Sequence, residues 1–494
     1  MAFLTEAANR GSISTGYDID NSCKFEPDNS EYLGKTPTSS GNRRTFTISM
    51  WIKRTEIGMD CYLLEAGDGD YNQSDRTLIK FDSDDKFRFG GGSAYQRITN
   101  RVFRDTSAWY HIVMAVDTTD STAGNRLKLY VNGVQETSFG TSSDPSQNFE
   151  YAFCKDDEHT VGFNHTDNVS YYAGYMSEVI LIDGQQLDPT SFGEFDEDSG
   201  IWKPIDVSNL TFGTNGFYLD FEDGSNLGND ASGGTDFTEN NITSADQATD
   251  TPTNNFATLN PLHMYSGTAS HNPSFVEGAT RFRTERSGYW TNSIASMGIT
   301  KGKWYFEAQP GTSNTHITSI GYGDESDIND WAQNQADTNG FCGETSTNSI
   351  GYLGSDTETT YGNVWTGTGS KSGAANSANY TISNIVGVAI DADNGYIYFA
   401  KDNTYINSGN PGSGASGTGG DTFEDTTTPR TGTVFPSVGG YHHTAATVIN
   451  VNFGGYTTIS ISSAATDANG YGTFEYAPPS GYYALCTKNL AEYG

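Results

Sequence analysis

The chain has 494 residues, enough for two to four domains of about 150 residues each, and its 35% hydrophobic content provides apolar side chains for folded cores. Its formal net charge of −34, from 61 acidic and 27 basic residues, argues against nucleic acid as a partner because like charges repel. The 57 glycines and only 18% charged residues favour many short strands joined by turns over helical bundles.

The cysteines and the first residues bear on the cellular compartment. Five cysteines lie far apart without a C-x-x-C pair, which argues against a cysteine zinc site; they are Cys23, Cys61, Cys154, Cys342 and Cys486. The opening "MAFLTEAANRGS" lacks the features of a secretory signal, and no stretch approaches the roughly 18 apolar residues of a membrane span. We therefore expect folding in a reducing cytoplasm and no membrane insertion.

Alternating side chains begin after an N-terminal arm, residues 1–42. In "TFTISMWIK" one face collects apolar residues, and "WYHIVMAVD" repeats the pattern; the first set is Phe46, Ile48, Met50 and Ile52. The Asn132-Gly133 pair between apolar runs predicts a hairpin. Strands recur over residues 43–204 without a convincing helix, so this region is predicted to form two packed antiparallel sheets.

The next segment, residues 205–262, is rich in Asn, Asp, Thr, Ser and Gly. We predict a strand near residues 217–221 and otherwise an ordered or semi-ordered connector between domains, with a flexible linker as the alternative.

A second strand-rich region covers residues 263–494, with a C-terminal extension. Within it, "AIDADNGYIYFAKD" (389–402) resembles a calcium loop, but glycine is fifth rather than sixth, the twelfth residue is Asp402, and both flanks alternate like strands. This stretch is predicted to be a hairpin. The glycine-rich stretch 407–420 has no helix after it to form a phosphate cradle, so a mobile surface loop is predicted.

The first region resembles the laminin-G and pentraxin-like branch of the concanavalin-A-like sandwiches. The resemblance rests on "FTISMWIKR", "LLEAGDGD", "TLIKFDSDDKFRFG", "WYHIVMAVD", "LKLYVNGVQE" and "YMSEVILIDGQQLDP", which together cover most of residues 43–204. The second region resembles a SPRY domain through "KWYFEA", "SIGYG", "IVGVAIDADNGYIYFAKDNTYI", "FPSVGG" and "INVNFGG". The expected fold is all-β, with two concanavalin-A-like antiparallel β-sandwiches (jelly rolls) in tandem.

The tandem order, with "DTPTNNFATLNP" and the ending "PPSGYYALCTKNL", is similar to virion proteins of tailed bacteriophages. The resemblance implies a tail fibre or a capsid decoration that folds in the host cytoplasm and works on the virion surface. It implies other virion proteins and a host-surface glycan or receptor as partners, and we expect a homo-oligomer. A purely architectural subunit without a ligand is a further alternative.

Sandwiches of this shape include glycoside hydrolases, which need two carboxylates on one concave strand. The nearest match to their Glu-x-Asp-x-x-Glu pattern, "EFDEDS", has Ser199 in place of the second Glu, and "YLDFED" offers only Asp220 and Glu222. We therefore predict a protein that is not an enzyme, with a polysaccharide-degrading enzyme as the alternative.

The laminin-G and pentraxin resemblance implies a calcium site at the sheet rim. It selects Asp75, before "RTLIKF", and Asn164 and Asp167 in "GFNHTDN", and Asp68 and Asp70 are further candidates. Oxygen donors from separate loops suit calcium. The alternative is that these are solvated loop acids without a metal.

Carbohydrate binding uses exposed aromatic rings that stack on sugar faces. The candidates, each predicted to lie in a polar loop, are Tyr71, Tyr171, Tyr172 and Tyr441, and half-buried packing is the alternative for each. Trp51, Trp109 and Trp304 lie within predicted strands and are expected in the core.

Overall fold

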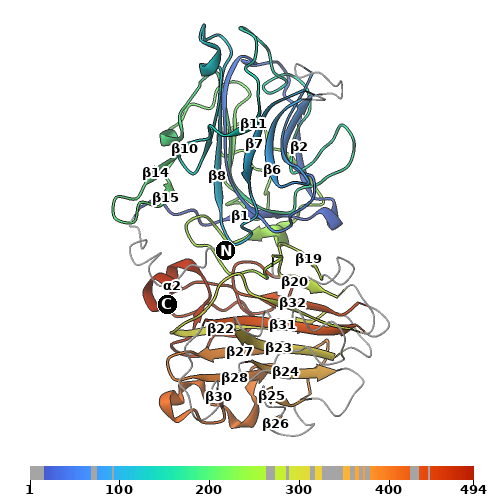
Figure 1. Ribbon diagram of the computed structural model, residues 1–494, viewed down its shortest axis with the longest axis vertical. Helices are drawn as coiled ribbons and strands as arrows, with labels where there is room; N and C mark the ends of the chain where they lie inside the picture. The colour runs from blue at the N-terminus through green and yellow to red at the C-terminus, as the bar shows by residue number, and fades with distance from the viewer. Residues whose placement is uncertain are drawn as a thin grey trace. The chain divides into compact units, whose positions relative to one another are not determined.

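The computed structural model describes residues 16–67, 75–91, 94–262, 273–284, 289–311, 317–324, 349–355, 362–366, 371–372, 379–422, 433–442 and 446–494. The chain divides into two compact units, with the boundary between Asn254 and Asn255. Each unit is built around two large sheets in which nearly all strand pairs are antiparallel (Figure 1). The predicted all-β class with two tandem sandwiches is therefore confirmed.

The first unit contains two sheets of eight strands each. The first sheet, called sheet A, runs in the order β10 (Val134–Gln135), β9 (Leu127–Val131), β8 (Tyr110–Asp117), β3 (Thr45–Arg54), β13 (Gly174–Asp183), β1 (Ser22–Phe25) and β18 (Gln247–Ala248), with β16 (Phe217–Leu219) paired to β13. The second, sheet B, runs β11 (Phe139–Ser142), β7 (Ala94–Val102), β6 (Lys86–Gly91), β5 (Arg76–Phe81), β4 (Cys61–Gly67), β12 (His159–Val161), β2 (Tyr32–Lys35) and β17 (Thr238–Asn240). A separate hairpin joins β14 (Gly193–Phe195) to β15 (Trp202–Pro204), and the 3₁₀ helices are η1 (Pro27–Asn29), η2 (Ala123–Asn125), η3 (Pro189–Ser191) and η4 (Ser244–Asp246).

The alternation read from the sequence places the core of this unit. The four predicted residues of β3 share one buried cluster with residues of sheet B such as Ile79 and Phe81. Successive side chains of a strand point to opposite faces, so residues two positions apart share one face. The Asn132-Gly133 turn joins β9 and β10, and both residues have the positive φ, 48° and 76°, that a tight hairpin turn requires.

The predicted connector, residues 205–262, is wrong as a separate element, because residues as far as Asn254 belong to the first sandwich. β16, near the predicted strand, pairs with β13, β17 pairs with β2, and β18 pairs with β1. The N-terminal arm is likewise incorporated, since β1 and β2 lie within the two sheets. The polar composition misled because the apolar residues that this segment adds to the core, such as Phe217, Leu227 and Phe237, are spaced widely among polar ones.

Buried lysines show why this polar segment is held against sheet A. Lys53 and Asp250 form an ion pair with Nζ–Oδ2 2.6 Å, and Trp109 Nε1 donates to Asp250 Oδ1 at 3.1 Å. Lys53 and Asp250 are both nearly inaccessible to solvent. A buried ammonium needs such a carboxylate, so Asp250 of this acidic segment neutralises Lys53 of sheet A.

The second unit contains a nine-stranded and a six-stranded sheet. The larger runs β19 (Ser274–Val276), β20 (Arg281–Arg283), β32 (Val448–Asn452), β22 (Lys303–Pro310), β27 (Val386–Asp391), β28 (Tyr396–Lys401) and β29 (Thr404–Tyr405), with β30 (Asp421–Thr422) on β28 and β33 (Tyr483–Ala484) on β22. The smaller runs β21 (Tyr289–Ile294), β31 (Val434–His442), β23 (Ile317–Asp324), β24 (Ile350–Ser355), β25 (Val364–Thr366) and β26 (Lys371–Ser372). The helices among the described residues of this unit are η6 (Ile406–Ser408), η7 (Pro411–Ser416) and α2 (Thr487–Tyr493).

The hairpin predicted at residues 389–402 is confirmed. β27 and β28 pair antiparallel, and Gly395, with φ 75°, completes the turn between them. Asp391 accepts hydrogen bonds from the backbone and side chain of Asn394 and forms an ion pair with Lys303, Nζ–Oδ2 2.8 Å. The acids of this stretch therefore organise a turn.

The glycine-rich stretch 407–420 is ordered as η7 and adjoining turns rather than as the predicted mobile loop. Its glycines allow close packing on tyrosine rings. A Cβ added at Gly417 would lie 2.1 Å from Tyr396 Cε1, and one at Gly420 would lie 2.6 Å from Tyr398 Cε1. Glycine is needed here because the rings of β28 occupy the space of any side chain.

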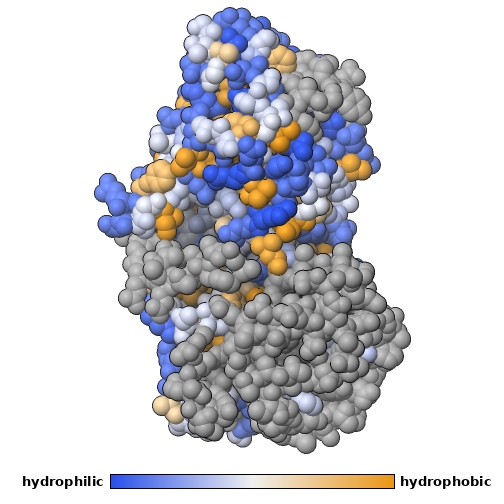
Figure 2. Space-filling model, viewed as in Figure 1, coloured by the Kyte–Doolittle hydropathy of each residue, from blue (hydrophilic) through white to orange (hydrophobic). Residues whose placement is uncertain are grey.

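Hydrophilic residues dominate the face of the first unit that Figure 2 shows, with hydrophobic residues in small groups. The exposed large apolar side chains include Val134, Phe195 and Ile201. Scattered exposures of this kind are common on folded proteins.

The three tryptophans expected in the core, Trp51, Trp109 and Trp304, are buried as predicted.

Candidate functional site

Two of the predicted site residues of the first unit, Asn164 and Asp167, meet side chains on the outer face of sheet B. Thr77, Ile79 and Phe81 of β5 are buried, with Ile79 and Phe81 in the core, so Arg76 points to the opposite face. Glu65 of β4 lies directly across from Leu78 and therefore shares the outer face with Arg76. The loop of residues 162–171, which follows β12, brings further polar side chains to these two residues.

Arg76 lies at the centre of a group of polar side chains that we call the outer-face ion cluster: Glu65, Arg76, Asn164, His165 and Asp167. Arg76 Nη2 donates to Asn164 Oδ1 at 2.8 Å and to Asp167 Oδ2 at 3.0 Å, and its Nε–H pairs with Glu65. Glu65 and Arg76 are buried, whereas the Asp167 side chain is 38% exposed. One planar guanidinium thus binds three acceptors from two separate segments.

Calcium binding stays a prediction. Two of its predicted ligands, Asn164 and Asp167, are bridged by a positively charged side chain, that of Arg76. Asn164 and Asp167 come together as predicted, and the guanidinium of Arg76 contacts both. Asp75 faces Lys155 instead, with Nζ–Oδ1 3.9 Å. Within the part of the chain that the structure describes, no group of three or more His, Cys, Asp or Glu side chains is placed to hold a metal. Asp68 and Asp70 lie outside the described residues.

His165 adds a titratable group to the outer-face ion cluster. Its Nδ1 lies 3.4 Å from Glu65 Oε2, and its Nε2 hydrogen-bonds to the carbonyl oxygen of Gly67. Burial of the ring lowers the pKa of His165, but the hydrogen bond and charge of Glu65 outweigh burial, so the pKa is raised. With acceptors at both ring nitrogens, the protonated imidazolium is favoured.

The four predicted tyrosines have different positions. Tyr172 is fully buried and donates to the carbonyl oxygen of Lys53 at 3.0 Å, so its predicted role as an exposed stacking ring is wrong. Tyr441 is half-buried within β31 of the second unit, beside Trp290 at a ring distance of 5.8 Å, rather than in a loop. Tyr71 lies outside the described residues, and Tyr171 remains half-exposed.

Tyr171 belongs to a set of three rings that we call the aromatic platform: Tyr32, Phe163 and Tyr171. Phe163 stacks on Tyr171 with centroids 4.4 Å apart and contacts Tyr32 at 4.5 Å. Phe163 is buried, whereas Tyr32 and Tyr171 are half-exposed. Because Leu33 points into the core, Tyr32 and Gly34 face outward on β2.

Polar side chains from two other segments border the aromatic platform. A Cβ placed on Gly34 would lie 3.5 Å from Glu158 Oε1, 3.7 Å from Asn240 Nδ2 and 3.7 Å from Tyr32 Cε2. The exposed carboxylate of Glu158 and the amide of Asn240 therefore converge beside the ring of Tyr32. An aromatic surface with an adjacent acceptor and donor can stack on one face of a sugar and hydrogen-bond its hydroxyls.

Sequence reasoning identified Tyr171 but missed Tyr32, Glu158 and Asn240. Tyr32 lies in β2, Glu158 directly precedes β12 and Asn240 ends β17, and the pairing of β2 with both strands brings them together. The local sequence around Asn240 is a polar Asn-Asn pair with no sign of a site, and the sequence does not show which strand lies beside it.

A buried Ser–His pair elsewhere in this unit has the wrong hydrogen-bonding pattern for nucleophilic catalysis. Ser49 Oγ lies 2.8 Å from His111 Nε2, and Trp202 Nε1 donates to His111 Nδ1 at 3.0 Å. Because Nδ1 accepts, the neutral ring carries its proton on Nε2 and donates to Ser49, which cannot then be deprotonated by it. The second predicted carboxylate pair, Asp220 and Glu222, lies beyond the end of β16 rather than on a strand.

None of the helices among the described residues is long and apolar enough to cross a membrane.

One family model matches part of the first sandwich. Residues 28–185 match the family model described as the concanavalin A-like lectin/glucanases superfamily (Laminin_G_3). This segment contains Tyr32, Glu158 and Tyr171 and all of the outer-face ion cluster, and it is less than half of the chain. The chain is thus an all-β protein whose first sandwich is concanavalin A-like over the matched residues. No curated protein matches it.

Solved structures similar to parts of the chain belong to several proteins. The SPRY domain of human HERC1 is 15% identical, with 39% of this chain and 96% of that one covered and a TM-score of 0.27. The SAP-like pentraxin of Limulus polyphemus is 16% identical, with 35% and 80% covered and a TM-score of 0.26. Domain 4 of the arabinanase AbnA from Geobacillus stearothermophilus, solved with arabinotriose, is 21% identical, with 31% and 65% covered and a TM-score of 0.23.

Proposed function

We propose that the first sandwich binds carbohydrate at the aromatic platform. The observation that carries this proposal is the pair of half-exposed rings, Tyr32 and Tyr171, beside the converging side chains of Glu158 and Asn240. Phe163, buried beneath, holds the two rings in place before any ligand arrives, so little conformational entropy is lost on binding. The family model that covers this segment is that of a lectin and glucanase superfamily, which favours a sugar as the ligand.

Binding to a glycan array, followed by titration calorimetry with the best ligand, tests this proposal. Replacing both rings, Tyr32→Ala with Tyr171→Ala, is expected to weaken binding by tenfold or more, about 1.4 kcal/mol. The control is Tyr130→Ala, which removes a half-buried tyrosine from β9 of sheet A. Equal binding by the wild type and the double variant would contradict the proposal, and a blank array would favour a purely architectural subunit.

The second part of the proposal concerns where the protein acts. We infer a virion surface protein of a tailed bacteriophage, either a tail fibre or a capsid decoration, that folds in the host cytoplasm and displays its loops to the host glycan or to other virion proteins. Support comes from the tandem order of the two sandwiches and the motifs that resemble such proteins. Several copies as a homo-oligomer would strengthen weak single contacts. Labelling intact particles with an antibody against the chain tests this part.

We further propose that binding occurs without hydrolysis. The buried carboxylate of Glu65 is engaged by Arg76 and His165, and the Ser49–His111 pair has its proton on the wrong nitrogen for catalysis. Release of reducing ends from the bound polysaccharide would instead support the polysaccharide-degrading alternative.

We also propose that calcium can bind Asn164 and Asp167, where it has to compete with the guanidinium of Arg76 for their oxygen atoms. A rise in melting temperature on adding calcium, reversed by a chelator, would support it.

A further inference from the structure

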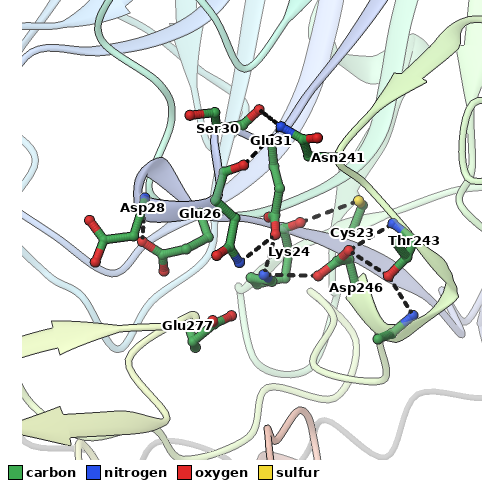
Figure 3. A network of polar contacts seen from close by, with 12 residues as sticks. Cys23, Lys24, Glu26, Asp28, Ser30, Glu31, Asn241, Thr243, Asp246 and Glu277 are labelled. Atoms are coloured by element: carbon green, nitrogen blue, oxygen red, sulfur yellow. Dashed lines mark hydrogen bonds and ion pairs between the residues drawn. The ribbon is translucent and has the colours of Figure 1, made fainter.

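Lys24 of β1 lies between two carboxylates in the interior of the first unit. Its Nζ is 2.8 Å from Glu31 Oε1 and 2.8 Å from Asp246 Oδ1 (Figure 3). The side chain of Lys24 is 0% exposed, and those of Glu31 and Asp246 are 2% and 7% exposed. An amine and two carboxyl groups are therefore held in contact with little access to water.

The carboxyl group of Asp246 is oriented by the turn that contains it. Thr243 caps η4, and its backbone N–H and hydroxyl both donate to Asp246 Oδ2, at 2.8 Å and 3.2 Å. Oδ1 is left to face Lys24 Nζ. Two donors on one oxygen polarise the carboxyl carbon and stabilise negative charge that develops on that oxygen during nucleophilic attack.

Glu31 is suited to transfer protons at this place. Burial raises the pKa of Glu31 to about 7, against the lowering effect of Lys24, so a large fraction of the group carries a proton near neutral pH. Asn29 Nδ2 donates to Oε1 at 2.9 Å, while the buried Oε2 has no hydrogen-bond partner among the described residues. A carboxyl group of this kind can accept a proton from one neighbour and return it to another.

From this geometry we propose that Lys24 and Asp246 join in an intramolecular amide bond, formed by the folded protein itself with Glu31 as the proton carrier. The Lys24 ammonium gives one proton to the Asp246 carboxylate, which leaves a neutral amine beside a neutral acid. Nζ attacks Cγ, the Nζ–Cγ bond forms, and the oxyanion on Oδ2 is held by the two Thr243 donors. Glu31 takes a proton from Nζ and delivers it to the departing Oδ1, so the Cγ–Oδ1 bond breaks and one water molecule leaves. No oxidant, reductant or cofactor is needed.

The product replaces a buried ammonium and a buried carboxylate by a neutral amide. Oδ2 becomes the amide oxygen and keeps its donors from Thr243. The bond would join β1 to the turn before β18, two segments from opposite ends of the unit, and so restrict the unfolded chain as a long-range disulfide does.

The other buried lysine of sheet A provides a comparison within the same molecule. Lys53 Nζ lies 2.6 Å from Asp250 Oδ2, but the other oxygen of Asp250 accepts from the indole N–H of Trp109, a donor that cannot relay a proton. Lys53 is therefore expected to keep a free amine. A single tryptic digest reports whether the amine of each lysine is modified.

Mass spectrometry of the full-length wild-type chain under denaturing conditions tests the proposal. The intact mass is expected to be lower than the sequence mass by one water. After tryptic digestion we expect a branched peptide that joins Lys24 to Asp246, no cleavage after Lys24, and normal cleavage after Lys53. A full intact mass with cleavage after Lys24 would overturn the proposal. So would a water loss that maps elsewhere, for example to a cyclised Asp223-Gly224.

Variants separate the roles of the three residues. Glu31→Gln keeps the size of the side chain but removes the proton carrier, and a folded Glu31→Gln chain is expected to retain its full mass. Lys24→Met is expected to retain its full mass as well. Circular dichroism checks the fold of each variant, and the wild-type result stands even if both fail to fold. If the Glu31→Gln chain forms the Lys24–Asp246 bond to the same extent as the wild type, the role of Glu31 is overturned.

Discussion

Arg76 decides what a group of acidic and amide side chains can hold. Glu65, Asn164 and Asp167 offer oxygen atoms of the kind that calcium prefers, and the guanidinium occupies the position between them. A sequence pattern can identify oxygen donors that come together. It does not show which positively charged side chain of a neighbouring strand balances their charge.

We expect Arg76→Ala to lower the free energy of unfolding of the first unit by about 3–5 kcal/mol, because it leaves the buried carboxylate of Glu65 uncompensated. Urea unfolding measures this. Arg44→Ala is the matched control: Arg44 and Glu150 have side chains 46% and 43% exposed, and an exposed pair contributes about 0–1 kcal/mol. Similar losses in the two variants would contradict the account of the outer-face ion cluster.

Glu178 is a buried acid whose protonation should make stability depend on pH. It lies in β13 at a register shift, with φ 51°, and accepts a hydrogen bond from Tyr218 Oη at 2.8 Å. Burial raises the pKa of Glu178 to about 8, with Asp220 and Glu222 adding to the effect. Its ordinary pKa is 4.5, so between these values the folded chain binds a proton that the unfolded chain has lost.

The contribution of Glu178 is therefore fully present below about pH 4.5 and is lost as the pH rises towards about 8. Glu178→Gln, which can still accept from Tyr218, is expected to flatten the fall in unfolding free energy across this window by on the order of a few kcal/mol. Urea unfolding at several pH values provides the measurement. Glu150→Gln, at an exposed position, serves as the control, and parallel pH profiles for the wild type and Glu178→Gln would contradict the prediction.

The glycine-rich segment 407–420 shows how composition can mislead about an element. Glycine and serine predict flexibility when nothing packs against them, but here Tyr398 donates or accepts a hydrogen bond at Ser413, and Tyr482 donates to the carbonyl of Pro411. The tyrosines that order the segment lie on β28 and beyond residue 480, so its local sequence carries no sign of them.

Two glycines of this segment allow a matched test. Neither Gly420 nor Gly412 has a left-handed φ, but a Cβ at Gly420 meets the buried ring of Tyr398 at 2.6 Å, whereas at Gly412 the nearest atom is Asn410 Oδ1 at 3.3 Å. We expect Gly420→Ala to destabilise the second unit by about 1–3 kcal/mol. Gly412→Ala should stay within about 0.5 kcal/mol of wild type in thermal unfolding. Equal effects would mean that the segment does not pack on the tyrosines.

The whole chain is organised differently from the predicted arm, sandwich, connector and sandwich. β1 and β2 near the start of the first unit and β16, β17 and β18 in its last forty residues are strands of its sheets, so the two ends of the unit complete them. The predicted connector also carries Asp246 and Asp250, the partners of two buried lysines.

A fragment of residues 16–254 is therefore expected to unfold cooperatively by itself, as is residues 255–494. The shorter 43–204, which lacks five strands and leaves Lys53 without Asp250, should give no cooperative transition. Circular dichroism with urea measures all three fragments. A cooperative transition in 43–204 equal to that of 16–254 would show that the added strands are dispensable.

Local alternation was enough to predict the all-β class, the core face of β3, the Asn132-Gly133 turn and the hairpin at 389–402. Each of these depends on residues a few positions apart, whose geometry is a property of the strand or turn itself. Tyr171 was found for the same reason, since it lies in a polar loop.

Only the tertiary structure decided the rest: that Tyr32 faces Asn240, that Arg76 meets Asp167, and that Lys24 lies between Glu31 and Asp246. Asn240, Asp167 and Asp246 lie far along the chain from their partners, and a shift of one residue in register would turn Tyr32, Arg76 or Lys24 to the other face of its strand. An acid or a tyrosine has the same local signature whether it is solvated or buried against a cation, so only the folded sheets distinguish the two.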